Sequence, residues 1–325
     1  MCGRMPRSVL HVFIDTNVLL NFYSFTQDDL EELRKLRVAV ENGEIRLWTT
    51  TQAADELARN RENKIAEAMR ALKDIKVPSK VPAVARNLPE FEELMEARRE
   101  YDRHLNALQQ QLAQQFKDGH LVADQVLEEL GYVAQVIAVS EDIRAAAMRR
   151  VETGNPPGKD GVGDAVNWEC LLAECPDGED LYLVTEDADF ISPLDSDRIA
   201  AVLADEWSEK KQSHVGLYRR ISSLFQDHFP QIRLASELEK QFRIRRLRRS
   251  GSFEETHRAI AGLAEYDEFT DQEARELLEA AVWNSQVNWI SRDQDVLEFY
   301  TDLLNDHRDS FEEDELERFT EVFAA

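Results

Sequence analysis

Two carboxylates lie just past apolar runs, where a charge is costly. In "HVFIDTNVLLNFY", residues 11–23, Asp15 comes immediately after Val12, Phe13 and Ile14. In "DLYLVTEDADF", residues 180–190, the apolar run from Leu181 to Val184 ends in acids that include Asp187. Burying an unpaired carboxylate costs several kcal/mol, so we expect the fold to supply something that holds these charges.

Two further acids lie where a helix is expected to begin. Asp164 follows the loop-like segment "TGNPPGKDGVG", residues 153–163. Glu56 falls in the first turns of a helix for which Thr49 and Gln52 form a capping-box pattern. Sites in open parallel sheets form at the carboxyl ends of the strands, so the fold can gather all four acids at one edge.

Such a gathering of acids predicts a divalent cation. Mutual repulsion would raise the pKa values of the carboxylates unless cations neutralise them. Hard oxygen ligands suit Mg²⁺ or Mn²⁺, and no histidine is placed to complete a zinc site. Each acid also has a structural alternative. Asp15 or Asp164 could cap a helix, Glu56 could be solvated, and Asp187 and Asp189 could begin a helix.

The composition indicates a globular, acidic protein. Hydrophobic residues make up 43% of the 325 residues, and no run approaches the roughly 20 apolar residues of a membrane span. Cys2, Cys170 and Cys175 have no zinc-like spacing, which favours reduced thiols and a cytoplasmic location. The net charge of −25 repels nucleic acid, so such a partner requires a local basic patch.

The order of patterns along the chain predicts an α/β fold with a largely parallel sheet. Strands are expected at residues 8–14, 44–50 and 181–184, with helices between them. Residues 90–151 resemble two long amphipathic helices broken near Gly131. We therefore predict a domain at 1–235 with a helical insertion at about 60–152, followed by a small all-helical domain at 236–325.

Four segments together resemble the acidic motifs of PIN-domain nucleases. They are "FIDTNVLLNFY", "TTTQAADELARNR", "GVGDAVNW" and "LVTEDADF". The resemblance implies a three-layer α/β/α sandwich and Mg²⁺- or Mn²⁺-dependent hydrolysis of phosphodiesters, most often in RNA. It implies that Asp15, Glu56, Asp164 and Asp187 are the catalytic and metal-binding acids, with Asp189 as a fifth ligand. Thr16, Asn17 and Thr185 would hold the carboxylates or contact phosphate.

Basic residues are candidates for contacts with phosphate. "FRIRRLRRS" concentrates five arginines, which either bind nucleic acid or dock against neighbouring helices. Trp283 and Trp289 are six apart on an expected helix, which favours core packing over base stacking. The predicted nucleic-acid contacts are Arg59, Lys64, Lys159, Arg243, Arg245, Arg246, Arg248 and Arg249, with Arg61 as a further candidate.

The function that we predict is a metal-dependent ribonuclease, in the role of a toxin or defence effector. A DNA nuclease with the same site and a PIN-like binding module with little catalysis are the alternatives. An inhibitory protein partner or a homo-oligomer is compatible with this prediction. A phosphatase of the haloacid dehalogenase type is disfavoured, because its second acid would stand where this chain has Asn17, an amide.

Overall fold

The chain forms two compact units in the computed structural model. The structure describes residues 9–23, 28–75, 81–119, 121–159, 161–230, 232–266 and 268–324. The units comprise Met1–Gln231 and Ile232–Ala325. The predicted boundary after residue 235 would cut helix α10 (Ala235–Arg249), and the structure moves the boundary into the segment before that helix.

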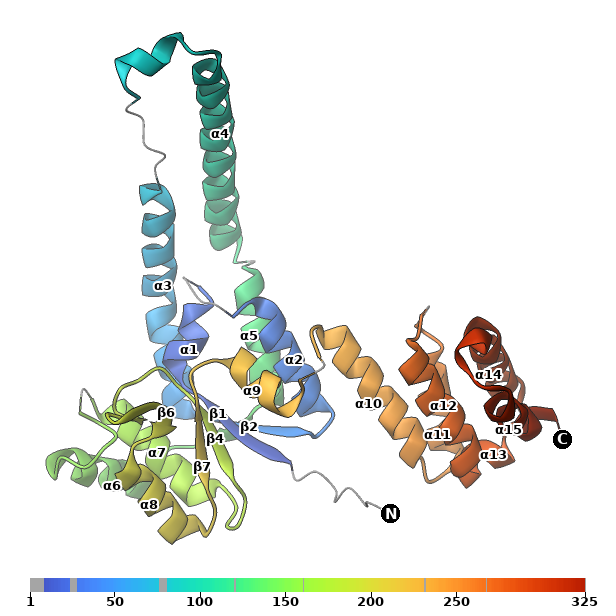
Figure 1. Ribbon diagram of the computed structural model, residues 1–325. Coiled ribbons are helices and arrows are strands. Elements are labelled where there is room, and N and C mark those ends of the chain that lie inside the picture. Colours follow the sequence, from blue (N-terminus) through green and yellow to red (C-terminus); the bar gives the residue numbers. More distant parts are fainter. Residues whose placement is uncertain are drawn as a thin grey trace. The chain divides into compact units, whose positions relative to one another are not determined.

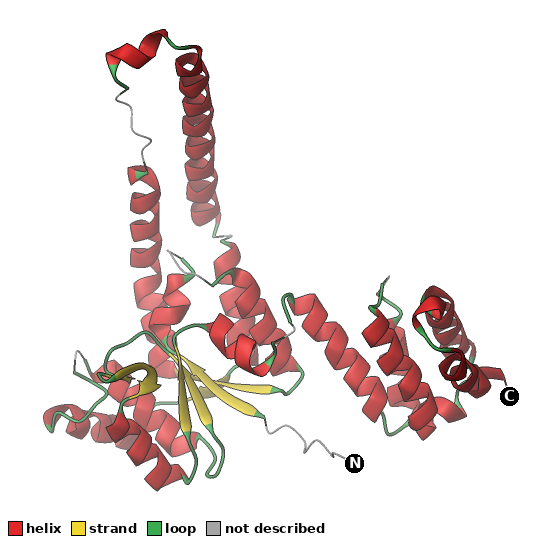
Figure 2. Ribbon diagram, in the orientation of Figure 1, coloured by secondary structure: helices red, strands yellow, loops and turns green. Residues whose placement is uncertain are grey.

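A five-stranded parallel sheet forms the centre of the first unit (Figure 2). Its strands are β1 (Leu10–Ile14), β2 (Ile45–Thr50), β3 (Gln135–Ile137), β4 (Leu181–Val184) and β7 (Val215–Tyr218), in the order β3-β2-β1-β4-β7. Every residue of β1 is buried, with Val12 opposite Leu47 and Phe13 opposite Leu183. Burial on both faces explains the continuous apolar run. The strand was expected to begin at residue 8, which lies outside the described residues.

Helices cover both faces of the sheet and complete a three-layer sandwich. Figure 1 shows α2 (Leu30–Glu41), α5 (Val122–Val133) and α9 (Ile221–His228) on one face, and α6 (Glu141–Glu152), α7 (Val162–Glu174) and α8 (Ala201–Lys211) on the other. Trp168 of α7 and Trp207 of α8 are fully buried in the second interface. The predicted α/β/α sandwich is thereby confirmed. Cys170 and Cys175 are buried free thiols in this unit, and Cys2 lies outside the described residues.

The order of the strands reverses beside β1. From β1 the chain moves outwards through β2 to β3, and it then returns to place β4 on the opposite side of β1. Such a switch point opens a crevice at the carboxyl ends of the two central strands. The short helix α1 (Thr16–Asn21) leaves β1 at this edge, and an antiparallel pair, β5 (Ile191–Ser192) with β6 (Asp195–Ile199), follows β4.

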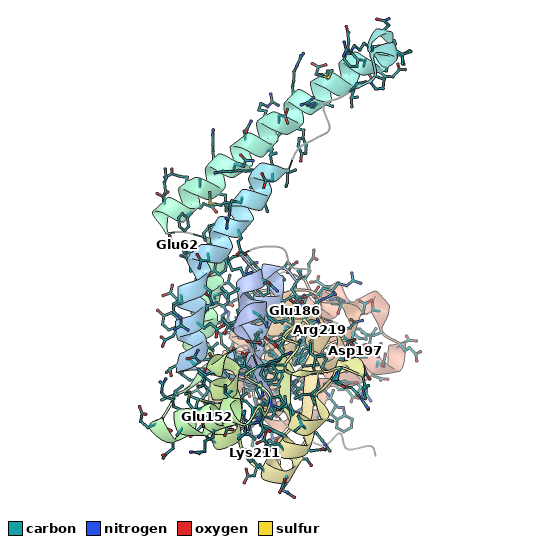
Figure 3. The ribbon with its side chains drawn as sticks, turned by 90° about the vertical axis from the view of Figure 1, so that its left-hand side faces the viewer. Glu62, Glu152, Glu186, Asp197, Lys211 and Arg219 are labelled. Atoms are coloured by element: carbon teal, nitrogen blue, oxygen red, sulfur yellow. The ribbon has the colours of Figure 1, made fainter. Side chains whose placement is uncertain are left out.

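A helical arm projects from this unit. Figure 3 shows it, with Glu62 on α3 (Thr51–Asp74); η1 (Ala83–Asn87) and α4 (Pro89–Asp118) complete it. A helix does end near Gly131, as predicted, since α5 ends at Val133. The arm helix α4 ends earlier, at Gly119, whose φ of 69° is the left-handed conformation that glycine adopts readily. Residues 122–152, predicted to belong to the insertion, form α5, β3 and α6 of the sandwich. None of the described helices has the length and apolar character needed to cross a membrane.

The second unit is all-helical, as predicted. It comprises α10, α11 (Phe253–Leu263), α12 (Asp271–Trp283), α13 (Ser285–Trp289), α14 (Gln294–Asp306), η2 (Arg308–Ser310) and α15 (Glu313–Ala324). Its own core includes Leu247, Leu277 and Tyr300, and the Tyr300 hydroxyl donates a hydrogen bond to the Leu277 carbonyl at 3.2 Å.

The predicted core packing of the two tryptophans of the second unit was wrong. Trp283 ends α12 and Trp289 ends α13, so they do not share one helix. Their side chains are 75% and 71% exposed. Asn284 interrupts the helical backbone between them, which no periodicity of apolar residues could reveal.

The cap of α3 is shifted by one residue from the predicted Thr49. The hydroxyl oxygen of Thr50 accepts a hydrogen bond from the Ala53 amide at 2.9 Å. The same hydroxyl donates to Asn167 Oδ1 at 2.5 Å and so ties α3 to α7. Because β2 continues through Thr50, the helix begins only at Thr51.

Replacing Thr50 with Ala should therefore destabilise the first unit. The change removes the cap and leaves the buried Asn167 carbonyl oxygen without its donor, at a cost of about 1–3 kcal/mol. Thr49→Ala is the matched control, because that hydroxyl caps no helix. Urea unfolding of the full chain should show a clear loss for Thr50→Ala and a smaller one for Thr49→Ala. Equal losses would contradict the assignment of the cap.

Candidate functional site

Asp15 is a buried carboxylate at the end of β1. It occupies the N-cap position of α1, yet its side chain makes no capping hydrogen bond. Its Oδ2 atom instead accepts hydrogen bonds from Thr185 Oγ1 at 2.6 Å and from Asn17 Nδ2 at 2.9 Å. Thr185 in turn accepts the amide of Asp187 at 3.0 Å. The ends of β1 and β4 are thus joined through one carboxylate.

Asp187 and Asp189 lie in a turn after β4, and no helix begins there. Asp187 Oδ1 accepts the amide of Asp189 at 2.7 Å. Asp189 Oδ2 accepts the amides of Gly158 at 3.1 Å and Lys159 at 2.6 Å. One oxygen of Asp189 therefore anchors the loop before α7, and only its other oxygen is free for a ligand.

Asp164 and Glu56 come from two helices that pack closely at this edge. Asp164 is the third residue of α7, and Glu56 lies in the second turn of α3. A side-chain carbon at Gly163 would lie 3.1 Å from Gln52 Nε2 and 3.5 Å from Glu56 Oε2. The absence of a side chain at Gly163 therefore permits the two helices to bring their acids together.

All five acids are close enough to influence one another electrostatically. Burial raises the pKa of Asp164 to about 7, and the charges of Asp15, Asp187, Glu56 and Asp189 add to this rise. Burial also raises the pKa of Asp15 to about 6, against the opposing effect of the Thr185 hydrogen bond. Within the described ranges, no lysine or arginine forms an ion pair with any of these acids. The cluster therefore lacks a compensating charge of its own.

The chemistry of this cluster fits an oxygen-ligated divalent cation. Its donors are carboxylates joined by neutral oxygens, the set that Mg²⁺ and Mn²⁺ prefer. Thr16 Oγ1 and Asn17 Oδ1, beside Asp15, are buried with no hydrogen-bond partner among the described residues. In the same part of the chain, no three Asp, Glu, His or Cys side chains already stand in the geometry of a metal site. The carboxylates would have to turn towards a cation on binding.

Two residues at this edge escaped the sequence prediction. Asn167 is buried and accepts the hydroxyl of Thr50, so it links the helices that carry Glu56 and Asp164. It lies three residues after Asp164, a spacing that places both on one helix face and could have identified it. Glu186 is held by Asn21 Nδ2 at 3.0 Å and adds an exposed acid beside Asp187.

The basic candidates near the acids differ in their availability. Arg59, one turn beyond Glu56, is exposed and forms no ion pair with a described residue. Lys159 is exposed in the loop that Asp189 anchors. Lys64 pairs with Glu67 at 3.2 Å. Arg61 is bound to Asp124 of α5, with its Nε atom 2.6 Å from Oδ1, and is therefore a structural residue.

The arginines of α10 divide in the same way. Arg243 bonds Glu239, Glu265 and the Gly262 carbonyl, so it fastens α10 to α11. Arg248 pairs with Glu276 at 3.1 Å, and Arg245 lies over the Phe242 ring. Arg246 and Arg249 are exposed, and neither forms an ion pair with a described residue. Contacts with neighbouring helices therefore account for only some of the arginines in "FRIRRLRRS".

A parallel α/β sandwich with a cluster of acids at its switch point defines a class of ligand-binding folds. In comparison with known families, a PIN domain model matches residues 12–190, more than half of the chain. The chain belongs to the PIN-domain family. PIN domains are generally nucleases that use divalent metals such as Mg²⁺ or Mn²⁺. No curated protein and no solved structure matches the chain.

Replacing Asp164 with Asn should stabilise the metal-free protein at neutral pH. A folded-state pKa near 7, above the ordinary value of 3.8, means that ionisation of Asp164 costs stability as pH rises between these values. In EDTA at pH 7.5, the Asp164→Asn variant should therefore melt at a higher temperature than the unmodified chain. Near pH 4 the two melting temperatures should be equal. Glu62→Gln, an equal change of charge at an exposed position of α3, is the control. A lower melting temperature for Asp164→Asn than for the unmodified chain at pH 7.5 would contradict repulsion among the clustered acids.

Proposed function

We propose that this chain is a metal-dependent endoribonuclease whose active site is the acidic edge at the switch point. The observation that carries the proposal is the convergence of carboxylates from four separate segments with no cation from the described protein among them. A merely structural cluster would be expected to pair its charges, because unpaired carboxylates in a partly buried site are destabilising. Membership of the PIN-domain family supports the same reaction class.

Each acid has a proposed role. Asp15, Asp164 and Asp187 would ligate Mg²⁺ or Mn²⁺ directly, and Glu56 would ligate it or orient the attacking water. Asp189 would act chiefly as the anchor of the loop that carries Lys159, since one of its oxygens accepts two amides. A bound divalent cation lowers the pKa of water and neutralises charge on the phosphate oxygens.

The neutral residues and the nearby cations complete the proposed site. Thr185 and Asn17 fix one oxygen of Asp15, so its other oxygen can face the crevice in a defined direction. Arg59 and Lys159 would contact phosphates on either side of the cleaved bond. Hydrolysis breaks the bond between phosphorus and a bridging oxygen after attack by water, and it needs no covalent nucleophile on the protein.

RNA is the proposed substrate and DNA is the alternative with the same chemistry. The preference for RNA rests on the family resemblance, because both polymers carry the phosphodiester. A role as a toxin or defence effector, and an inhibitory partner, stay predictions from the same resemblance.

Metal dependence provides the first test. The purified chain should cleave end-labelled single-stranded RNA with Mn²⁺ or Mg²⁺, lose this activity in EDTA and regain it with excess Mn²⁺. Each cation should also raise the melting temperature, because a ligand that binds only the folded state stabilises it. Parallel reactions with single-stranded and duplex DNA decide between the two substrates. Cleavage undiminished by the chelator would refute the metal mechanism.

Removal of single charges provides the second test. Asp15→Asn and Asp164→Asn keep the shape of the side chain, and each should slow cleavage by about a hundredfold or more, the scale of a lost electrostatic contact in an active site. Both variants should still bind RNA, since the acids repel the phosphate. Asp55→Asn, an exposed neighbour of Glu56, is the matched control and should retain normal cleavage. Near-normal rates in both site variants would assign these acids a structural role.

A further inference from the structure

One corner of the second unit exposes three aromatic side chains. We define this aromatic corner as residues 246–253 and 283–292. Trp283 is 75% exposed, Trp289 is 71% exposed and Phe253 is 45% exposed. The other three tryptophans of the chain, Trp48, Trp168 and Trp207, are at most 4% exposed. Contiguous exposed apolar surface rimmed by polar residues marks an interaction site.

The corner is a built part of the fold, not a frayed end. Asn284 Nδ2 donates hydrogen bonds to the carbonyls of Leu247 at 3.0 Å and Ser250 at 3.1 Å, which ties the α12–α13 junction to the end of α10. The Ser250 and Thr256 hydroxyls are 2.8 Å apart and fasten the start of α11. Trp289 packs edge-to-face on Phe253, with ring centroids 6.1 Å apart. No described ring packs against Trp283.

The charge of this corner favours an anionic partner. Residues 246–253 and 283–292 contain four arginines and no Asp or Glu residue, in a chain with a net charge of −25. Arg246 and Arg249 are three residues apart, so they share one face of the helix, and both are exposed without an ion pair to a described residue. Their charges are therefore available to a ligand.

The kind of apolar surface favours nucleobases over a protein. Every exposed large apolar side chain within the aromatic corner is aromatic, and none is aliphatic. Aromatic rings stack on bases of any sequence, and arginines beside them bind the phosphates of the same strand. A duplex offers no free base faces, so the partner with matching chemistry is a single strand.

We propose that the aromatic corner binds single-stranded RNA, with Trp283 and Trp289 stacking on unpaired bases and Arg246 and Arg249 contacting phosphates. This inference rests on the proposed function, because it assigns a second contact to the substrate of the acidic site. The corner serves as an anchor and takes no part in the chemistry.

The test compares RNA binding by full-length variants in EDTA, where no cleavage is expected. Trp283→Ala with Trp289→Ala should weaken binding of a labelled 20-nucleotide RNA at least about tenfold, since each lost stacking contact weakens binding. Phe at both positions should restore much of the affinity. Arg246→Gln with Arg249→Gln should flatten the slope of log affinity against log salt by about 1.4. The control variant, Arg308→Gln with Arg318→Gln, removes the same charge elsewhere in the unit. It should flatten the salt slope less than the Arg246 and Arg249 variant does.

Tryptophan fluorescence gives an independent readout on the unmodified chain. Acrylamide should quench the two exposed tryptophans, and single-stranded RNA should protect them, whereas duplex RNA should not. The same measurement with single-stranded DNA shows whether the corner distinguishes RNA from DNA. Unchanged affinity of the double alanine variant, no protection by RNA, or equal protection by the duplex would overturn the proposal, and the corner would then fit a protein partner.

The outcome is separable from that of the proposed function. Cleavage with Mn²⁺ but no effect of the tryptophan variants on binding would refute the anchor and leave the nuclease intact. Binding lost in the tryptophan variants, with no cleavage under any metal, would support the anchor and refute the nuclease.

Discussion

The hydrogen bond from Thr185 to Asp15 is the contact on which the acidic edge depends. Thr185 continues the line of β4 and Asp15 continues the line of β1, so this bond spans the switch point of the sheet. The backbone prepares it, since the Asp15 amide donates to the Val184 carbonyl at 2.9 Å. Through the same hydroxyl, the turn that carries Asp187 is fixed as well. Two acids far apart in the sequence are thus placed by one threonine.

The contrast with other buried charges in the same unit shows why this edge is unusual. Arg150 donates to Glu169 and Glu206 at 2.6 Å, and Trp168 donates to Glu206 at 2.9 Å. Burial alone would raise the pKa of Glu206, but these donors and Lys210 lower it to about 2. The fold therefore compensates a half-buried carboxylate with positive partners where only stability matters. At the switch point it supplies neutral donors to Asp15 and leaves Asp164 with a pKa near 7. A local departure from complete pairing is what a functional site is expected to show.

The sequence was most informative where one residue type carried a distinct physical cost. An acid at or just past the end of an apolar strand, as at Asp15 and Asp187, identified the edge of the sheet because burial makes such positions expensive. The cap of α3 was misplaced by one residue, since Thr49, Thr50 and Thr51 have equal propensity and only the end of β2 selects among them. The end of the arm helix at Gly119 was not predicted, because the left-handed backbone of this glycine is a property of the tertiary path. Short β3 has three residues and no pattern that distinguishes it from a helix.

A different kind of information decides the roles of the basic and aromatic residues. Five arginines in "FRIRRLRRS" look equivalent as letters, but partners distant in sequence, such as Gly262 and Glu265 for Arg243, occupy some and leave others exposed. In the same way, Asn284 separates two tryptophans that a continuous helix would have placed together. Contacts of this kind arise only once the helices have packed.

The acidity of this edge of the sheet imposes a further condition on any polyanionic substrate. Carboxylates without compensating cations repel phosphate, so affinity must come from positions where free basic or stacking groups are available. Near the edge these are Arg59 and Lys159, and in the second unit they are Arg246 and Arg249 with the exposed tryptophans. Two weak contacts on one strand reinforce each other through effective concentration, provided that the strand is long enough to reach both. On this proposal, length and unpaired bases select the substrate, and the acidic edge contributes chemistry while adding little affinity.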